Sequence, residues 1–281
     1  MTTVKETNDN TRGIHVRLAE TPAEIEAAQR LRYEVFYREF GAKADAEMEK
    51  SGLDRDYFDD FTAHLIVIDP NAKDQNLGVV GTYRLLNANA AKRAGRFYTS
   101  DEYDIAPLTT SSNNMLEMGR SCVLEPYRTM SVLQLLWSGI AHYISEHQID
   151  LMFGCASLHG TDPQALKHEL SLLYHNHLAP AELRPRAVAS RYVDMNMLPR
   201  DQIDARHVFM KLPPLIKGYI RAGAMVGDGA VIDHQFNTVD VCIVMPTYMI
   251  TEKYVKHYDL MVTGSSLPNR ALKKVAGGED E

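Results

Sequence analysis

Two apolar, β-branched runs separated by a short polar stretch constrain the fold of this chain most strongly. The runs AHLIVID (63–69) and GVVGTYRLL (78–86) flank the turn-like PNAKDQN and predict an antiparallel hairpin. Further strands are predicted over 114–124 and 150–160, and a helical pattern follows each of them. Antiparallel strands followed by β-α-β units predict an α/β (α+β) fold, with a mixed central sheet and helices on both of its faces.

The helical patterns carry recognisable start signals. Thr21 is a good N-cap, Pro22 occupies the first helical position and Glu24 completes a capping box, which predicts a helix up to residue 40. Asp162 is likewise expected to cap a helix over 162–178. The other predicted elements are strands over 14–19 and 237–245, helices over 126–148, 213–224 and 246–258, a turn at 227–230 and an irregular basic stretch over 179–212.

Composition limits the class of protein. The chain has 281 residues, enough for one large domain or one domain with an appendage. Its net charge of -7 argues against a duplex nucleic-acid binder, which needs a large basic surface. Three scattered cysteines, no secretory signal and no sufficiently long apolar stretch predict a cytoplasmic protein without a membrane span.

The charge is distributed unevenly along the chain. Residues 45–60 carry seven acids and two bases, and residues 184–221 carry eight bases and three acids. An acidic partner can therefore be attracted to one region of a chain that is acidic overall.

Charged side chains interrupt several otherwise apolar elements. The strand Leu116–Val123 contains Glu117 and Arg120, and Arg32 and Arg84 lie in a predicted helix and strand. Charged residues are seldom buried unless they are paired or functional. A structural ion-pair network and an active site are both compatible with this pattern.

Several sequence blocks occur in an order and at spacings that are typical of one family. They are LRYEVFYREFG (31–41), DRDYFDD (54–60) with the strand after it, GTYRLL (81–86), EMGRSCVLEPYR (117–128) and the long segment 213–245. This pattern resembles the acyl-homoserine-lactone synthases and, more closely, the ornithine lipid N-acyltransferases, both within the Gcn5-related N-acyltransferase (GNAT) fold. The resemblance covers residues 14–260.

The resemblance implies a domain organisation and a reaction. We expect a disordered N-terminus (1–12), one acyltransferase domain (13–260) with a basic partner segment (179–224) in its C-terminal extension, and a flexible tail (261–281). The family moves a 3-hydroxy fatty acyl group from acyl carrier protein to the α-amine of ornithine and forms lyso-ornithine lipid. No bound cofactor or metal is expected. The residues that match the family's charged cluster are Arg32, Phe36, Asp56, Asp59, Arg84, Glu117 and Arg120.

Chemical roles follow from the residue types. Glu117 can accept the proton that the α-ammonium must lose, and Arg120 can stabilise an oxyanion or hold Glu117 in place. The δ-ammonium of ornithine needs an anion and its carboxylate needs a cation. Candidates for the anion are Asp56, Asp59 and Asp60, with Asp233 and Asp240 as further candidates for the acceptor pocket, and candidates for the cation are Arg32 and Arg84.

The donor site departs from the fold's usual pattern. The turn that enters the central helix reads RTMSVL (128–133), with Arg128 and Ser131 but without the glycines that cradle a CoA pyrophosphate. This departure favours a carrier-protein donor, which lacks the adenosine diphosphate. Arg184, Arg186 and Arg191 can attract an acidic carrier, and the basic segment can also contact the inner face of a membrane.

Three alternatives remain open. The same chemistry can act on glutamine, lysine or glycine. A related enzyme can make an acyl-homoserine-lactone signal. In a different class, the chain is a non-catalytic protein that binds lipid surfaces, with a structural charged cluster.

Overall fold

The computed structural model describes residues 13–72, 76–112 and 114–250. Our expectations for residues 1–12, for the helix beyond residue 250 and for the tail 261–281 lie outside this part of the chain. Within the described ranges, every helix is too short or too polar to span a bilayer.

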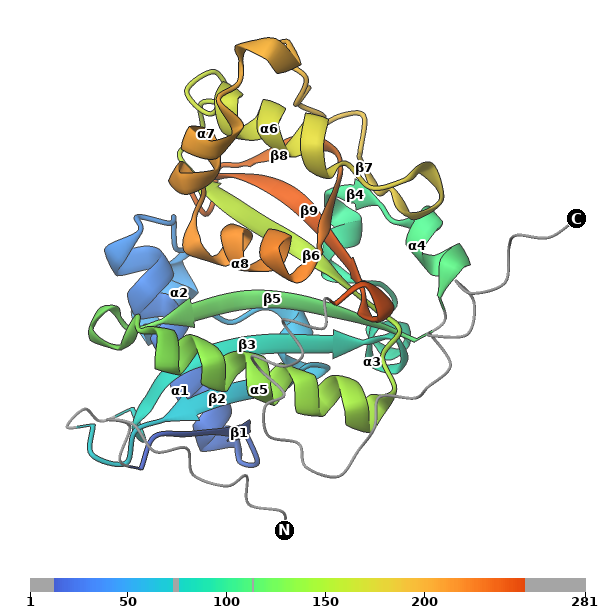
Figure 1. The fold of residues 1–281 in the computed structure, drawn as a ribbon. Helices are drawn as coiled ribbons and strands as arrows, with labels where there is room; N and C mark the ends of the chain where they lie inside the picture. The colour runs from blue at the N-terminus through green and yellow to red at the C-terminus, as the bar shows by residue number, and fades with distance from the viewer. Residues whose placement is uncertain (1–12, 73–75, 113, 251–281) are drawn as a thin grey trace, which may run out of the picture.

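The described strands form one mixed sheet in the order β1-β2-β3-β5-β6-β9-β8-β7-β4 (Figure 1). The pairs β5–β6 and β7–β8 are parallel and the remaining pairs are antiparallel. The strands are β1 (His15–Leu18), β2 (Ala63–Ile68), β3 (Val79–Asn87), β4 (Tyr103–Asp104), β5 (Met115–Val123), β6 (Leu151–His159), β7 (Arg186–Ala187), β8 (Met225–Asp233) and β9 (Thr238–Pro246).

Helices cover both faces of this sheet, as predicted. The α-helices are α1 (Pro22–Tyr33), α2 (Ala46–Ser51), α3 (Ala88–Arg93), α4 (Ala106–Ser111), α5 (Met130–His147), α6 (Lys167–His177), α7 (Ala205–Lys211) and α8 (Pro214–Ala222). The chain continues α1 as a π-helix, η1 (Glu34–Glu39). The short 3-10 turns are η2 (Tyr57–Asp60), η3 (Tyr98–Asp101), η4 (Glu125–Tyr127), η5 (Ala181–Leu183), η6 (Arg200–Gln202) and η7 (Thr247–Met249).

The two faces have separate cores. Helices α5 and α8 lie over one face (Figure 1), where Leu136, Ile140 and Tyr219 pack into the largest apolar cluster. Helix α1 packs on β3 and β5 on the opposite face, and its Ala28 and Leu31 join a smaller cluster there. The face that carries α1 also carries the charged residues described below.

The start of the first helix agrees with its sequence signals. The Thr21 side chain accepts a hydrogen bond from the backbone N–H of Glu24, and the Glu24 carboxylate accepts one from the N–H of Thr21. The 63–69 and 78–86 runs form the antiparallel pair β2–β3, with a register shift after Val67.

Other predictions about local structure were wrong. Helix α6 begins at Lys167, because Asp162 instead accepts from the N–H of Gln164 in a separate turn. The predicted turn at 227–230 lies inside strand β8, where Gly227 and Gly229 lie close to the chain at Pro185 and Tyr192. The 179–212 stretch, predicted to be irregular, contains the helix α7. No secondary structure was predicted for the acidic 45–60 stretch, which contains the helix α2.

The central strands β5 and β6 are paired over only part of their length. Their parallel register runs from Met115↔Leu151 to Glu117↔Phe153, and Figure 1 shows β6 then turning away from β5 together with β9. Gly154 lies at the point of divergence, where an added Cβ would be 2.2 Å from the carbonyl oxygen of Met118. The strands can approach this closely only because residue 154 has no side chain.

We therefore expect Gly154→Ala to destabilise the protein by about 1–3 kcal/mol, because the new methyl group would have to displace backbone atoms. Gly119→Ala is the matched control on β5, since an added Cβ there meets no atom within 4 Å. Urea unfolding of both variants measures the difference. Equal unfolding free energies for the two variants would contradict this account of the divergence.

Candidate active site

Arg32 lies at the centre of a buried ion-pair network on the α1 face of the sheet. Its side chain is only 1% exposed. The Nε atom donates to Asp54 Oδ2 at 2.7 Å, and Nη2 donates to both carboxylate oxygens of Asp59 at 2.9 Å. Asp59 also caps the turn η2 by accepting from the N–H of Asp56 at 3.0 Å. The acidic 54–60 segment is therefore anchored to the first helix.

Two further arginines extend the network from the strands. Arg84 on β3 donates to Asp56 Oδ1 at 2.6 Å, and Arg120 on β5 donates to Asp56 Oδ2 at 3.2 Å. Arg120 Nε also lies 3.2 Å from Asp54 Oδ2, although the angle does not suit a hydrogen bond. The sequence blocks that carry Arg32, Asp56, Asp59, Arg84 and Arg120 thus meet in space.

Arg120 reaches this network through an unusual backbone conformation. Its φ is +51°, and the β3–β5 register shifts between Thr82 and Arg84. Left-handed φ values are uncommon for residues other than glycine and often mark functional positions. The guanidinium lies 5.0 Å from the ring of Tyr98 and 4.4 Å from the ring of Phe236, and Phe236 in turn contacts Phe36 edge-on.

The network is balanced in charge, with three arginines against three aspartates. Burial alone raises the pKa of Asp54, but Arg120 and Arg32 together lower it below its ordinary value. The pKa of Asp56 is lowered in the same way by Arg84 and Arg120. Asp56 and Asp59, which were candidates for an ammonium site, are already paired with arginines here.

Glu117 lies beside this network and contacts different residues. It is 4% exposed, and its Oε1 accepts from the N–H and hydroxyl of Thr99 while its Oε2 accepts from the N–H of Tyr98 at 2.8 Å. Burial raises its pKa, although these hydrogen bonds oppose the shift. Arg120 is not among its hydrogen-bond partners, so burial decides the upward direction of the Glu117 pKa shift.

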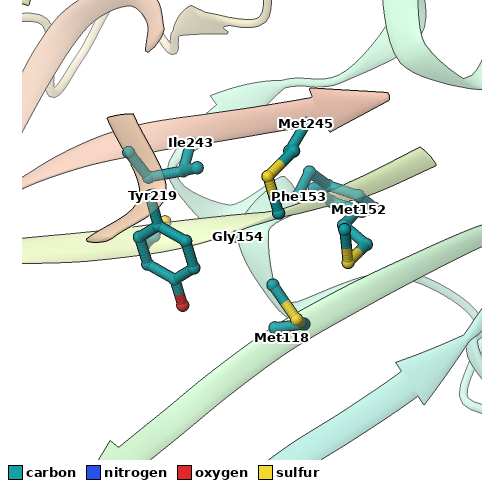
Figure 2. Close-up of a pocket in the computed structure, with 8 residues that line it drawn as sticks. Met118, Met152, Phe153, Gly154, Tyr219, Ile243 and Met245 are labelled. Atoms are coloured by element: carbon teal, nitrogen blue, oxygen red, sulfur yellow. The ribbon is translucent and has the colours of Figure 1, made fainter. Parts of the chain in front are cut away.

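A small apolar cavity lies where β5 and β6 diverge (Figure 2). Its volume is about 10 Å³, room for about one water molecule. Methionines dominate its wall, and their flexible side chains can rearrange around a larger apolar group. The lining residues are Met118, Met152, Phe153, Gly154, Cys155, Tyr219, Ile243 and Met245.

The predicted donor residues lie at the start of α5. Arg128 makes a bidentate pair with Glu39 at 2.5 and 2.6 Å and donates to the carbonyl of Val123. Thr129 caps α5, and Ser131 lies in its first turn. The charge of Arg128 is thus compensated within the protein.

The three arginines predicted to attract a carrier protein each contact a different group of the protein. Arg184 donates to the carbonyl of Ala179, and Arg186, with a side chain 62% exposed, pairs with Asp228. Arg191 instead lies 3.1 Å from Glu102 Oε1.

Glu102 belongs to an acidic cluster that sequence reasoning identified only in part. Glu102, Asp233 and Asp240 each place a carboxylate oxygen within 4.8 Å of the others, and all three are buried. Burial, reinforced by Glu102, raises the pKa of Asp240 to about 7. Asp233 and Asp240 were acceptor candidates, whereas nothing in the polar stretch around Glu102 distinguished it from surface acids.

The fold and this site define a class of protein. Residues 31–138 match the acetyltransferase (GNAT) domain family. Together with the mixed sheet and the diverging central strands, this match makes the chain an acyltransferase of the GNAT fold, as predicted.

Relatives that align over most of their length identify the family within the GNAT fold. The L-ornithine N(alpha)-acyltransferase of Brucella abortus (strain 2308) is 44% identical over 250 residues, which cover 87% of this chain and 88% of that protein. The enzyme of the same name from Rhodobacter capsulatus is 42% identical, over 89% of this chain and 96% of that protein. The chain belongs to the L-ornithine N(alpha)-acyltransferase family.

A solved structure shows a more distant similarity. The CoA-dependent acyl-homoserine lactone synthase BjaI, with MTA, aligns with a TM-score of 0.46 and 12% identity over 88% of this chain and 89% of that one. This similarity is too distant for residues or ligands to be transferred from BjaI.

The raised pKa of Asp240 leads to a prediction about stability. A carboxyl group whose pKa is higher in the folded than in the unfolded state contributes stability below the unfolded value, about 4, and loses it as the pH rises through about 7. We expect Asp240→Asn, which carries no charge, to be more stable than the parent protein at pH 8 by a few kcal/mol, and by much less at pH 4.5.

Denaturant unfolding at the two pH values measures this difference. Asp104→Asn is the control, because Asp104 is exposed and the amide oxygen can still accept from the N–H of Ala106. The prediction would be contradicted if the unfolding free energies of Asp240→Asn and the parent protein differed by the same amount at both pH values.

Proposed function

We propose that this protein transfers a 3-hydroxy fatty acyl group from an acyl carrier protein thioester to the α-amine of L-ornithine, giving lyso-ornithine lipid. The observation that carries the proposal is the 42–44% identity, over nearly the whole length, to enzymes named L-ornithine N(alpha)-acyltransferase. The structure has an apolar cavity where β5 and β6 diverge and a charged, largely buried cluster on the α1 face, and these two environments suit an amphiphilic product of this kind.

The divergence of β5 and β6 suits an extended thioester donor. No further register pairs of these two strands follow Glu117↔Phe153 in the described part of the chain. Facing strand edges can pair with an extended chain that carries amide groups, as a pantetheine arm does. The acyl chain of the donor would enter the methionine-lined cavity and enlarge it.

A carrier protein is the proposed form of the donor. The α5 entry lacks the glycines of a pyrophosphate-binding turn, and Arg128 is paired with Glu39. The basic segment 184–221, with eight bases and three acids, offers positive charge to an acidic carrier, and Arg186 in it is exposed although it pairs with Asp228. The same basic segment is the proposed contact for a membrane surface.

Direct transfer requires a base and a site for developing charge. The amine nitrogen attacks the thioester carbonyl, a C–N bond forms, the C–S bond breaks and the thiolate leaves with the carrier. We assign proton removal to Glu117, whose Oε2 accepts one hydrogen bond and can accept another. Arg120, at the more exposed edge of the network, is assigned to the oxyanion or to the carboxylate of the acceptor, and Arg84 supports it through Asp56.

Mass spectrometry of reactions with purified components tests the function. We expect 3-hydroxyacyl carrier protein and ornithine to give a product with the mass of N-acyl ornithine, and acyl-CoA at the same concentration to give much less. Acylation of glutamine, lysine or glycine in preference to ornithine would contradict the acceptor assignment. Equal rates with acyl-CoA would contradict the donor assignment.

Replacement of Glu117 tests the proposed base. We expect Glu117→Gln to lower kcat by about 10²-fold or more and to remove the rise of kcat with pH that accompanies ionisation of a base. Thr99→Val is the comparison, because it removes one hydrogen bond to Oε1 and leaves the carboxylate in place. If both variants lose the same activity and keep the same pH profile, Glu117 positions the 98–99 loop and is not the base.

A further inference from the structure

The acidic cluster of Glu102, Asp233 and Asp240 has the features of a binding site for a small cation. The three residues come from the segment after η3, the end of β8 and the beginning of β9, and they are 4%, 8% and 6% exposed. Their carboxylate oxygens lie within 4.8 Å of one another. Like charges at this separation and burial repel each other strongly unless a cation or a bound proton compensates them.

Two buried polar atoms at the cluster have no hydrogen-bond partner in the described part of the chain. They are Asp240 Oδ1 and Thr238 Oγ1, and Thr238 is 5% exposed. The hydroxyls of Ser157 and Thr238 are close enough to lower the pKa of Asp240, but neither Asp240 Oδ1 nor Thr238 Oγ1 makes a hydrogen bond of normal geometry in the described part of the chain. A buried acceptor without a donor is costly, so these atoms point to a donor that comes from outside the chain.

The cluster is also undercompensated in charge. Arg191 pairs with Glu102 at 3.1 Å, and within the described residues no lysine or arginine pairs with Asp233 or Asp240. Asp233 Oδ1 accepts only from the backbone N–H groups of Gln235 and Phe236. The neighbouring network of Arg32, Arg84 and Arg120 has a cation for every aspartate, so the two clusters differ in their capacity for an added positive charge.

Short contacts connect this cluster to the proposed reaction centre. The backbone N–H of Phe236 donates to Asp233, and the ring of Phe236 lies 4.4 Å from the guanidinium of Arg120. On the other side, Cys155 Sγ lies 3.2 Å from Glu102 Oε2 and 3.9 Å from Thr99 Oγ1, and Thr99 holds Glu117. The cluster is therefore one layer of side chains away from both Arg120 and Glu117.

We propose that Glu102, Asp233 and Asp240 bind the terminal ammonium group of a diamino acid acceptor and thereby select it over amino acids with neutral side chains. This inference rests on the proposed function. A primary ammonium has three N–H donors, which match three carboxylates and the unpartnered Asp240 Oδ1. With the acceptor carboxylate at Arg120 and the ammonium at the cluster, the side chain of the acceptor would pass Phe236, and the α-amine would lie at the Arg120 end, next to the carboxylate.

The test compares acceptors that differ only in the ammonium group. Norvaline has the carbon skeleton of ornithine without the δ-ammonium. We expect Asp240→Asn and Asp233→Asn to raise KM for ornithine about 10- to 100-fold, the loss of one charged hydrogen bond, and to leave KM for norvaline unchanged. Asp104→Asn, with its exposed carboxylate two residues after Glu102, should leave both values unchanged.

Calorimetry without an acyl donor gives a second readout. The parent protein should bind ornithine more tightly than norvaline, and Asp240→Asn should remove that difference. If the parent protein acylates no ornithine, the proposed function fails whatever the cluster binds. If the parent protein acylates ornithine but the variants keep its KM and its preference over norvaline, the inference about the cluster fails alone.

Two other outcomes would overturn the inference. An equal loss of ornithine and norvaline turnover in well-folded variants would mean that the cluster is structural. Titration with Mn²⁺ tests for a metal site, since three carboxylates can also bind a divalent cation. Tight Mn²⁺ binding that Asp240→Asn abolishes, together with loss of ornithine turnover on chelation, would assign the cluster to a metal.

Discussion

The pairing of Arg32 with Asp54 and Asp59 is the interaction on which the site depends. A fully buried guanidinium is tolerated only with close anionic partners, and these partners are tolerated only with the guanidinium. The pairing therefore ties helix α1 to the acidic 54–60 segment. Asp56 of that segment then pairs with Arg84 on β3 and with Arg120 on β5, so both strands are tied to the same carboxylate.

The two charged clusters differ in how far arginines balance the negative charge of their carboxylates. The arginine–aspartate network is balanced, so its members hold one another in place and form a rigid platform beside the diverging strands. The cluster of Glu102, Asp233 and Asp240 has one arginine for three carboxylates, and Asp240 has a raised pKa as a result of burial and of Glu102. Proteins commonly retain such stability costs where a ligand is to be bound.

Local signals in the sequence predicted local structure well. The capping box at Thr21 and the turns of the long amphipathic helix α5 depend on neighbours within a few residues, and the β2–β3 hairpin pairs two runs that follow each other along the chain. One failure has a tertiary cause. Strand β8 contains two glycines that resemble a turn, but they are required because the chain at Pro185 and Tyr192 lies directly against them. The other failure is local, because Asp162 accepts from the N–H of Gln164 in a separate turn and helix α6 begins only at Lys167.

The sequence by itself determined the mixed sheet, the GNAT class, the family and most of the charged residues that meet at the Arg32 network, although it did not single out Asp54. Only the tertiary structure decided which charges compensate which. It paired Asp56 and Asp59 with arginines, gave Glu117 the partners Tyr98 and Thr99 in place of Arg120, and joined Glu102 to Asp233 and Asp240. Asp233 and Asp240 come together through the pairing of β8 with β9, which in turn pairs with β6. Contacts between residues so distant along the chain leave no periodic pattern in the sequence.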